Sequence, residues 1–278
     1  MDTVADRLDA ETADALLGAV AVSRSGLAPA DLASLLPGVG GQVRVAVFRR
    51  VLGGQLREAD ATGRLMFSHG VVREASALRA RADMHARLVA LRAADDVWDS
   101  MDALDVVWHA IASSAAGSAA ALARALNQRV AGTEVTLMRA LRAFPAGLDV
   151  IDALDPETLT EPGIEALLHA DQVLGGDHLS ALDRIRYGQR VLATARAASG
   201  TLGDRIVSWA ANNLGQSLSA VGDWSGARAV FEESLALARE LREAQPGLLQ
   251  PVRDVSVSLD NMGAVLKAVG DWAGARAV

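Results

Sequence analysis

The sequence predicts a protein that is all-α in bulk, with helical hairpins repeated along its C-terminal part. Two segments 48 residues apart, 212–230 and 260–278, are identical at 13 of 19 positions. Repeats of such length are typical of stacked helical units. Apolar residues make up 51% of the chain but aromatic residues only 4%, a balance that favours the close packing of helices over a β-sandwich.

The N-terminal part has a different pattern. Apolar periodicity predicts three helices and then two short strands, over Thr12–Arg24, Ala28–Leu36, Val43–Leu56, Gln55–Ala59 and Arg64–Ser68. Three helices followed by a β-hairpin is the order of a winged helix. We therefore expect a winged-helix-like domain and a following helix over residues 1–94.

The middle of the chain predicts a helical connector over residues 95–155. It is rich in alanine, and Ser113–Ala121 is expected to form a turn or a loose helix end. Asp155–Pro162 contains two prolines and is the expected linker into the repeats. The repeat array is then placed at residues 156–278, with a divergent earlier helix over Asp177–Ala198.

Each repeat predicts a helix, a Val-Gly-Asp turn and a second helix that starts at a tryptophan. Gly222 suits the left-handed position that ends a helix, and Asp223 is a good N-cap for the next one. The second helix is expected from Trp224 to about Ala244, and the next hairpin is expected after Pro251. Trp224 and its equivalent Trp272 are expected to pack between repeats. Because the chain stops at Val278, early in a helix, we expect a truncated array.

Residues Asp204–Val278 resemble the tetratricopeptide repeat family. The resemblance rests on Leu214-Gly215, Leu218, Gly222, Ala227 and Phe231, which stand at the family's spacing. The period of 48 exceeds the usual one of about 34 and is similar to that of kinesin-light-chain-like repeats. The late small residue and the terminal proline of the family do not match here.

The resemblance implies a solenoid whose first helices line a concave, partner-binding groove. By the family's spacing, the residues that face or border this groove are Trp209, Asn212, Asn213, Gln216, Ser219, Asp260, Asn261 and Lys267. Asn213 and Asn261 match the place where the family often bonds the backbone of a bound peptide. The alternative is that these amides bond neighbouring helices. The implied partner is a protein or a peptide.

A second resemblance covers Met66–Ala93. Phe67, His69, Val72, Arg73 and His85 resemble the segment after the ATPase module in signal-transduction ATPases with numerous domains. It implies that His69 contacts the phosphate of bound ADP and that an ATPase domain acts in cis or in trans. Gly70 replaces an Asp that often follows this histidine. A structural role for His69, capping the hairpin or the next helix, is the alternative.

Several function classes are excluded or disfavoured by composition. Lys267 is the single lysine and does not follow a glycine, so the chain holds no Walker A loop. There is no cysteine, and His69, His85, His109, His169 and His178 show no metal-binding spacing. We therefore expect no metal, no cofactor and no catalytic residues, and predict that the chain is not an enzyme.

The formal net charge of −7 disfavours nucleic acid as a partner. The acidic N-terminus lacks a basic leader and any apolar run long enough to span a bilayer, which indicates a cytoplasmic protein. The sequence thus predicts a protein- or peptide-binding scaffold, the sensor or regulatory part of a larger ATPase. Two alternatives stay open. One is a winged-helix transcription regulator that uses Arg44, Arg49 and Arg50. The other is a regulatory fragment whose catalytic domain lies outside the chain.

Overall fold

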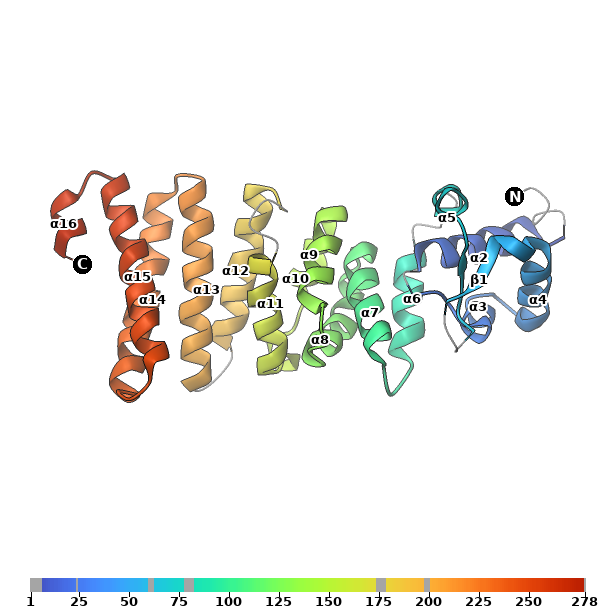
Figure 1. Ribbon diagram of the computed structural model, residues 1–278, viewed down its shortest axis with the longest axis horizontal. Coiled ribbons are helices and arrows are strands. Elements are labelled where there is room, and N and C mark those ends of the chain that lie inside the picture. Colours follow the sequence, from blue (N-terminus) through green and yellow to red (C-terminus); the bar gives the residue numbers. More distant parts are fainter. Residues whose placement is uncertain are drawn as a thin grey trace.

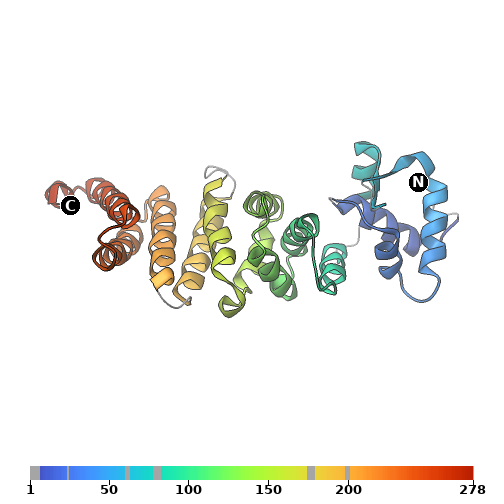
Figure 2. The same cartoon turned by 60° about the horizontal axis from the view of Figure 1, so that its bottom comes forward.

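The computed structural model describes residues 7–23, 25–59, 63–77, 83–173, 179–197 and 201–277. Helices make up 77% of the structure and pack consecutively, so the predicted all-α character is confirmed. The helices stand side by side in one elongated row, with the two termini at its opposite ends (Figures 1 and 2).

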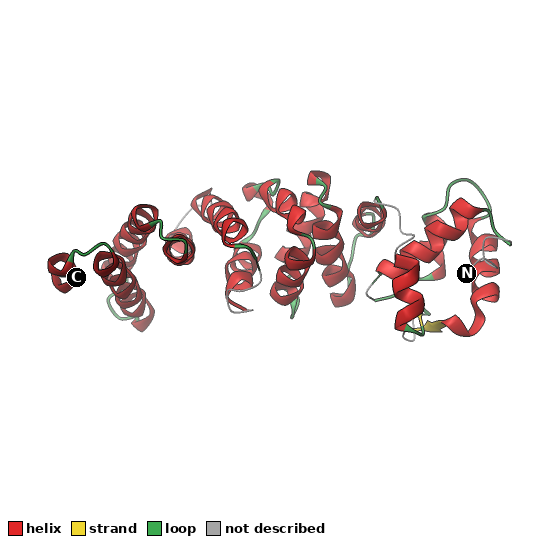
Figure 3. Ribbon diagram, turned by 90° about the horizontal axis from the view of Figure 1, so that it is seen from above, coloured by secondary structure: helices red, strands yellow, loops and turns green. Residues whose placement is uncertain are grey.

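The N-terminal unit combines short helices with one antiparallel hairpin. Its elements are α2 (Ala10–Val22), α3 (Pro29–Ser34), α4 (Gly41–Leu52), η1 (Gly53–Gln55), β1 (Leu56–Glu58), β2 (Leu65–Phe67) and α5 (Gly70–Ala77). Leu56 pairs with Phe67 and Glu58 with Leu65, while Leu27 bridges the other edge of β2. Figure 3 shows the hairpin at the N-terminal end of the row. The predicted order of three helices and a hairpin is confirmed.

The ends of these elements differ from the prediction by a few residues. The helix expected to reach Leu56 stops at Leu52, because Gly53 adopts a positive φ of 40° and breaks the helix. The helix expected from Thr12 begins at Ala10, because Asp9 caps it by accepting hydrogen bonds from the Thr12 N–H and hydroxyl. Its expected end at Arg24 lies outside the described residues.

The middle of the row consists of regular helices, some of them joined by short 3-10 turns. They are α6 (Met84–Ala93), α7 (Ser100–Ser113), η2 (Ala116–Ser118), α8 (Ala119–Asn127), α9 (Thr133–Ala143), η3 (Pro145–Gly147), α10 (Leu148–Asp152) and η4 (Pro156–Thr158). The alanine-rich Ser113–Ala121 spans the turn between α7 and α8, as predicted.

The C-terminal part contains the longest described helices, of 17 to 21 residues, between two shorter ones. They are α11 (Glu161–Val173), α12 (Ala181–Ala197), α13 (Thr201–Ala220), α14 (Trp224–Ala244), α15 (Leu249–Ala268) and α16 (Trp272–Ala277). The helix predicted at Asp177–Ala198 corresponds to α12, although both predicted ends lie outside the described residues. Pro162 lies inside α11 and Pro251 inside α15, so the predicted starts beyond these prolines are wrong. Both occupy the first turn, where a backbone N–H has no helical partner.

The turn between paired helices is the same in both repeats. Gly222 and Gly270 have φ values of 80° and 81°. The carboxylates of Asp223 and Asp271 then accept hydrogen bonds from the N–H groups of Gly226 and Gly274, at 2.9 and 2.8 Å. The predicted left-handed glycines and N-caps are therefore confirmed.

The turn tryptophans, which the sequence placed between repeats, are partly to largely exposed. Trp224 is 36% exposed and Trp272 is 61% exposed, and neither joins a hydrophobic cluster. The adjoining Val221 and Val269 are exposed as well. Each ring belongs to the first residue of its helix, α14 or α16, next to the capping aspartate.

Two large hydrophobic clusters divide the interior. The first joins buried residues from Leu8 to Leu88, and the second runs from Val89 to Leu266. Helix α6 contributes to both, through Leu88 and Val89. The second cluster continues through residue 155, where the sequence placed a domain boundary. Within the described residues, no helix is both long and apolar enough to cross a membrane.

Buried charges join the N-terminal unit to the rest of the row. Arg64, just before β2, pairs with Asp102 of α7 at 2.9 Å, and Arg92 of α6 pairs with Asp31 of α3 at 3.0 Å and with Asp102 at 3.4 Å. The side chains of Arg64, Arg92 and Asp102 are at most 11% exposed. Asp102 is thus the carboxylate that both buried guanidinium groups share.

Replacing Asp102 tests this junction. The change Asp102→Asn leaves two buried guanidinium groups short of a counter-charge, so we expect a loss of about 3 kcal/mol in the free energy of unfolding, measured by urea denaturation. Asp99→Asn is the matched control, because this carboxylate is 59% exposed and asparagine also caps helices. Equal losses in the two variants would refute the role given to Asp102.

A close approach inside the hairpin is the second testable feature. A Cβ atom on Gly215 of α13 would lie 2.5 Å from the ring of Phe231 of α14, which is 1% exposed. We expect Gly215→Val to lower the free energy of unfolding by about 2 kcal/mol. Gly247→Val, at a position where a Cβ atom would have no neighbour within 4 Å, should change it by less than about 0.5 kcal/mol. A stable Gly215 variant would show that the helices separate at little cost.

Candidate functional site

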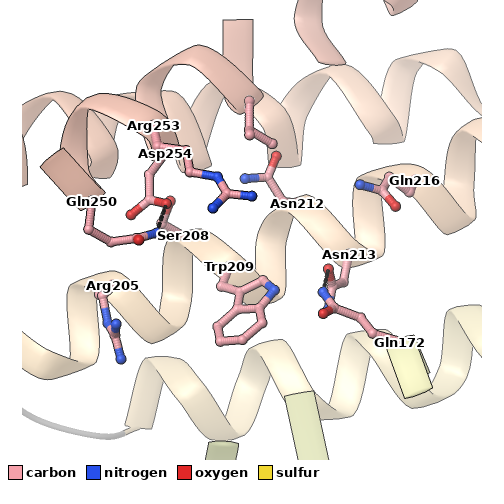
Figure 4. Close-up of a pocket in the computed structure, with 11 residues that line it drawn as sticks. Gln172, Arg205, Ser208, Trp209, Asn212, Asn213, Gln216, Gln250, Arg253 and Asp254 are labelled. Atoms are coloured by element: carbon pink, nitrogen blue, oxygen red, sulfur yellow. Dashed lines mark hydrogen bonds between the residues drawn. The ribbon is translucent and has the colours of Figure 1, made fainter. Parts of the chain in front are cut away.

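A cavity of about 370 Å³ lies between α11, α13 and α15. Its lining combines one indole ring, two guanidinium groups and several side-chain amides (Figure 4). The residues are Gln172, Arg205, Ser208, Trp209, Asn212, Asn213, Gln216, Gln250, Arg253, Asp254 and Val257. We call this the α13–α15 groove. Four of the residues that the sequence placed at a groove, Trp209, Asn212, Asn213 and Gln216, come together here.

Trp209 forms the apolar part of the groove. Its ring meets the ring of His169 on α11 edge to face, with the centroids 4.6 Å apart. Packing against His169 restricts the rotation of the indole while leaving part of its surface accessible. The groove thus has a rigid aromatic wall.

The asparagine amides bond neighbouring helices. Asn213 accepts a hydrogen bond from Gln172 Nε2 of α11 at 3.1 Å, and Asn261 Nδ2 donates to Asn212 Oδ1 of α13 at 3.1 Å. Asn213 and Asn261 are equivalent in the repeat, and each reaches back to the preceding first helix. This is the alternative that the sequence had left open for them. Exposed Gln216 forms no such bond within the described residues.

A buried column of hydroxyl groups sets the position of α15 against α13. Ser234 of α14 lies between Ser208 of α13 and Ser258 of α15, with both hydroxyl separations at 3.0 Å. Asn212 Nδ2 extends the column by donating to Ser258 Oγ at 3.3 Å. Ser234 and Ser258 are fully buried. Ser258 Oγ also donates to the Asp254 carbonyl of its own helix at 3.0 Å, but sliding α15 would break its bonds with Ser234 and Asn212, so the column favours one register of the groove walls.

The other predicted groove residues lie elsewhere. Asp260 and Lys267 are exposed and do not line the groove, and Asn261 is used in the contact with Asn212. Ser219 lies near the end of α13 with its hydroxyl buried. The residues of α15 that line the groove lie between Gln250 and Val257, before Asp260.

The sequence prediction missed seven lining residues. They are Gln172, Arg205, Ser208, Gln250, Arg253, Asp254 and Val257. One signal was available: Arg205 and Arg253 are 48 residues apart, as are Trp209 and Val257, so extending the repeat alignment upstream finds them. Gln172 had no such signal, because α11 shows no clear repeat sequence.

His69 stands at the bend between β2 and α5. Its backbone carbonyl accepts a hydrogen bond from the Arg73 N–H at 3.1 Å, as the residue before a helix does. The side chain is exposed and forms no hydrogen bond with the described residues. The arginines of α4 are more constrained: Arg44 donates to the carbonyls of Pro37 and Val39, and Arg49 pairs with Glu58.

Two histidines meet away from the groove. The Nδ1 atoms of His85 on α6 and His109 on α7 are 2.8 Å apart, so one nitrogen donates and the other accepts. Burial lowers the pKa of His85 below its ordinary value, because it disfavours the charged ring. The described residues contain no group of three or more side chains arranged to hold a metal ion, and His178 lies outside them.

Comparison of the chain with protein-family models, with curated proteins and with solved structures gives no match of any of these kinds.

The histidine pair predicts that stability falls on mild acidification. The unfolded chain binds a proton on His85 near its ordinary pKa of about 6.5, whereas the folded chain binds it less tightly. The free energy of unfolding should therefore fall as the pH drops below about 6.5. Urea denaturation at about pH 7.5 and about pH 5.5 measures the change, and His85→Gln should make it smaller. The same fall in both proteins would contradict the assignment.

Proposed function

We propose that the chain is a peptide-binding helical repeat scaffold and that the α13–α15 groove holds an extended segment of a protein partner. The observation that carries the proposal is that the groove is built from equivalent positions on successive repeats, Arg205 with Arg253 and Trp209 with Val257. The paired helices and glycine turns support a tetratricopeptide-like reading of residues 156–278. An array of this kind presents a continuous concave surface.

The composition of the groove favours a peptide over a small apolar ligand. Exposed side-chain amides, such as those of Gln172, Gln216 and Gln250, both donate and accept hydrogen bonds and suit the amide groups of a backbone. Helices in contact lie about 10 Å apart and an extended chain rises about 3.3 Å per residue. A segment crossing from α13 to α15 would thus place roughly three residues in the groove.

The same features favour binding over catalysis. The hydroxyl of Ser208 is engaged by Ser234 in the buried column, which leaves it a structural partner and a poor nucleophile. The chain alone is therefore proposed to be a recognition module and not an enzyme.

The N-terminal unit suggests which part of a larger protein would respond when a partner binds. We read residues 1–94 as a winged-helix-like domain and the chain as the sensor or regulatory part of a larger signalling ATPase. The support is the helix-and-hairpin order with an exposed His69 after β2. The buried charges around Asp102 would transmit a change in the row to that unit. The transcription-regulator alternative gains little support, because Arg44 and Arg49 already have partners within the unit.

A peptide screen tests the proposed function. Beads carrying random dodecapeptides, one sequence per bead, are incubated with the labelled chain, and enriched peptides are measured by fluorescence anisotropy. We expect Trp209→Ala to weaken binding about tenfold or more, on the order of 1.4 kcal/mol. Trp224→Ala is the matched control, since this exposed ring lies outside the groove.

Two results would refute the proposal. One is the absence of any enriched peptide. The other is equal weakening by the two tryptophan changes, which would place the binding surface away from the α13–α15 groove. Circular dichroism and thermal melting of each variant show whether the fold is intact.

A further inference from the structure

The α13–α15 groove carries two arginines. Arg205 of α13 and Arg253 of α15 both line it, one repeat apart, although the whole chain has a formal net charge of −7. The surroundings of these two arginines differ, and the difference indicates what the groove selects.

Arg205 is already held by a carboxylate. Its Nη2 atom lies 3.1 Å from Oε1 of Glu165 on α11, and Oε2 of Glu165 lies 3.1 Å from Nη1 of Arg129. The Glu165 side chain is only 12% exposed, whereas that of Arg205 is 40% exposed. Glu165 therefore fixes the orientation of Arg205 and screens part of its charge from a ligand.

Arg253 has no such partner. Within the described part of the chain it forms neither a hydrogen bond nor an ion pair, and it is exposed. The adjacent carboxylate of Asp254 instead accepts a hydrogen bond from Gln250 Nε2 at 2.8 Å. Figure 4 shows the guanidinium group of Arg253 extending over the groove toward Asn212, in the space that Trp209 also faces.

The charges at and behind the groove do not cancel. Three arginines, at positions 129, 205 and 253, stand with two carboxylates, Glu165 and Asp254. The site keeps one net positive charge, and the guanidinium group that lacks a counter-charge is that of Arg253. A planar guanidinium group binds a carboxylate through two parallel hydrogen bonds.

We propose that the groove selects a peptide carrying an acidic side chain beside an apolar one, and that Arg253 is the residue that recognises the acidic side chain. The apolar side chain packs on Trp209, and the amides that line the groove engage the backbone between them. Arg205 stands at the equivalent position of the preceding repeat but contributes little to this selection, because it is already paired with Glu165. This inference rests on the proposed peptide-binding function.

The same bead library tests it through the composition of the enriched peptides. We expect Asp or Glu next to an apolar residue in most of them. For one such peptide and its Glu-to-Gln counterpart, the unaltered chain should prefer the acidic form about tenfold, about 1.4 kcal/mol. Arg253→Gln should abolish this preference, and raising the salt concentration should reduce it. Arg205→Gln, the matched control, should leave most of it intact.

Glu165→Gln should strengthen peptide binding, a result that is not expected if Glu165 only stabilises the fold. Removing this carboxylate releases Arg205, so we expect tighter binding of peptides that carry a second acidic residue. If Arg253→Gln and Arg205→Gln weaken binding equally, or if Glu165→Gln has no such effect, the assignment to Arg253 is overturned.

Further arms separate the proposal from its rivals. If binding depends on a free C-terminal carboxylate and is lost when the peptide is amidated, the groove recognises the peptide terminus. That result would overturn the proposal that Arg253 binds an acidic side chain. Tenfold tighter binding of a phosphoserine peptide than of its Glu form would overturn it in favour of phosphate. Enriched peptides that depend on Trp209 but lack acidic residues would refute this inference and leave the proposed function standing. No enriched peptide at all would refute both.

Discussion

The buried column of Ser208, Ser234 and Ser258 is the contact on which the rest of the C-terminal structure depends. Hydroxyl groups with no access to water must find partners, and here each finds one on a neighbouring helix, while Ser258 also donates to the Asp254 carbonyl of its own helix. Apolar contacts between alanine- and leucine-rich helices tolerate some sliding, but a hydrogen-bonded column has one position in which every group is paired. It therefore determines which turn of α15 stands opposite Trp209.

This register decides the chemistry of the groove. The first turns of α15 line the cavity, so Arg253 faces it while Asp260 and Lys267 stay outside it. The Asn212–Asn261 hydrogen bond closes the same interface farther along the helices. The three asparagine amides that the sequence suggested for ligand contact thus hold helices together. The proposed recognition is carried by side chains without internal partners.

A second interface, between the N-terminal unit and α7, is held by buried charges instead of hydroxyl groups. Between the N-terminal unit and α7 the partners are charged, with Asp102 shared by Arg64 and Arg92. Buried ion pairs add little net stability, but they penalise every arrangement that separates them. The relative orientation of the helices is therefore restricted by hydrogen bonds at the C-terminal interface and by ion pairs at the N-terminal one. The helices between the groove and the N-terminal unit pack consecutively.

The sequence by itself determined the local structure: the helical bulk, the hairpin near the N-terminus, and the turns at Gly222 and Gly270, because these depend on residues close together in the chain. It also identified half of its proposed groove residues, since a repeat carries equivalent side chains to equivalent places. Only the tertiary structure decided the exposure of Trp224, the partners of Asn213 and Asn261, and the difference between Arg205 and Arg253. The two arginines differ because Glu165 pairs with Arg205 alone. Glu165 lies on α11, some forty residues before Arg205, and no local pattern reveals a contact between side chains so far apart in the chain.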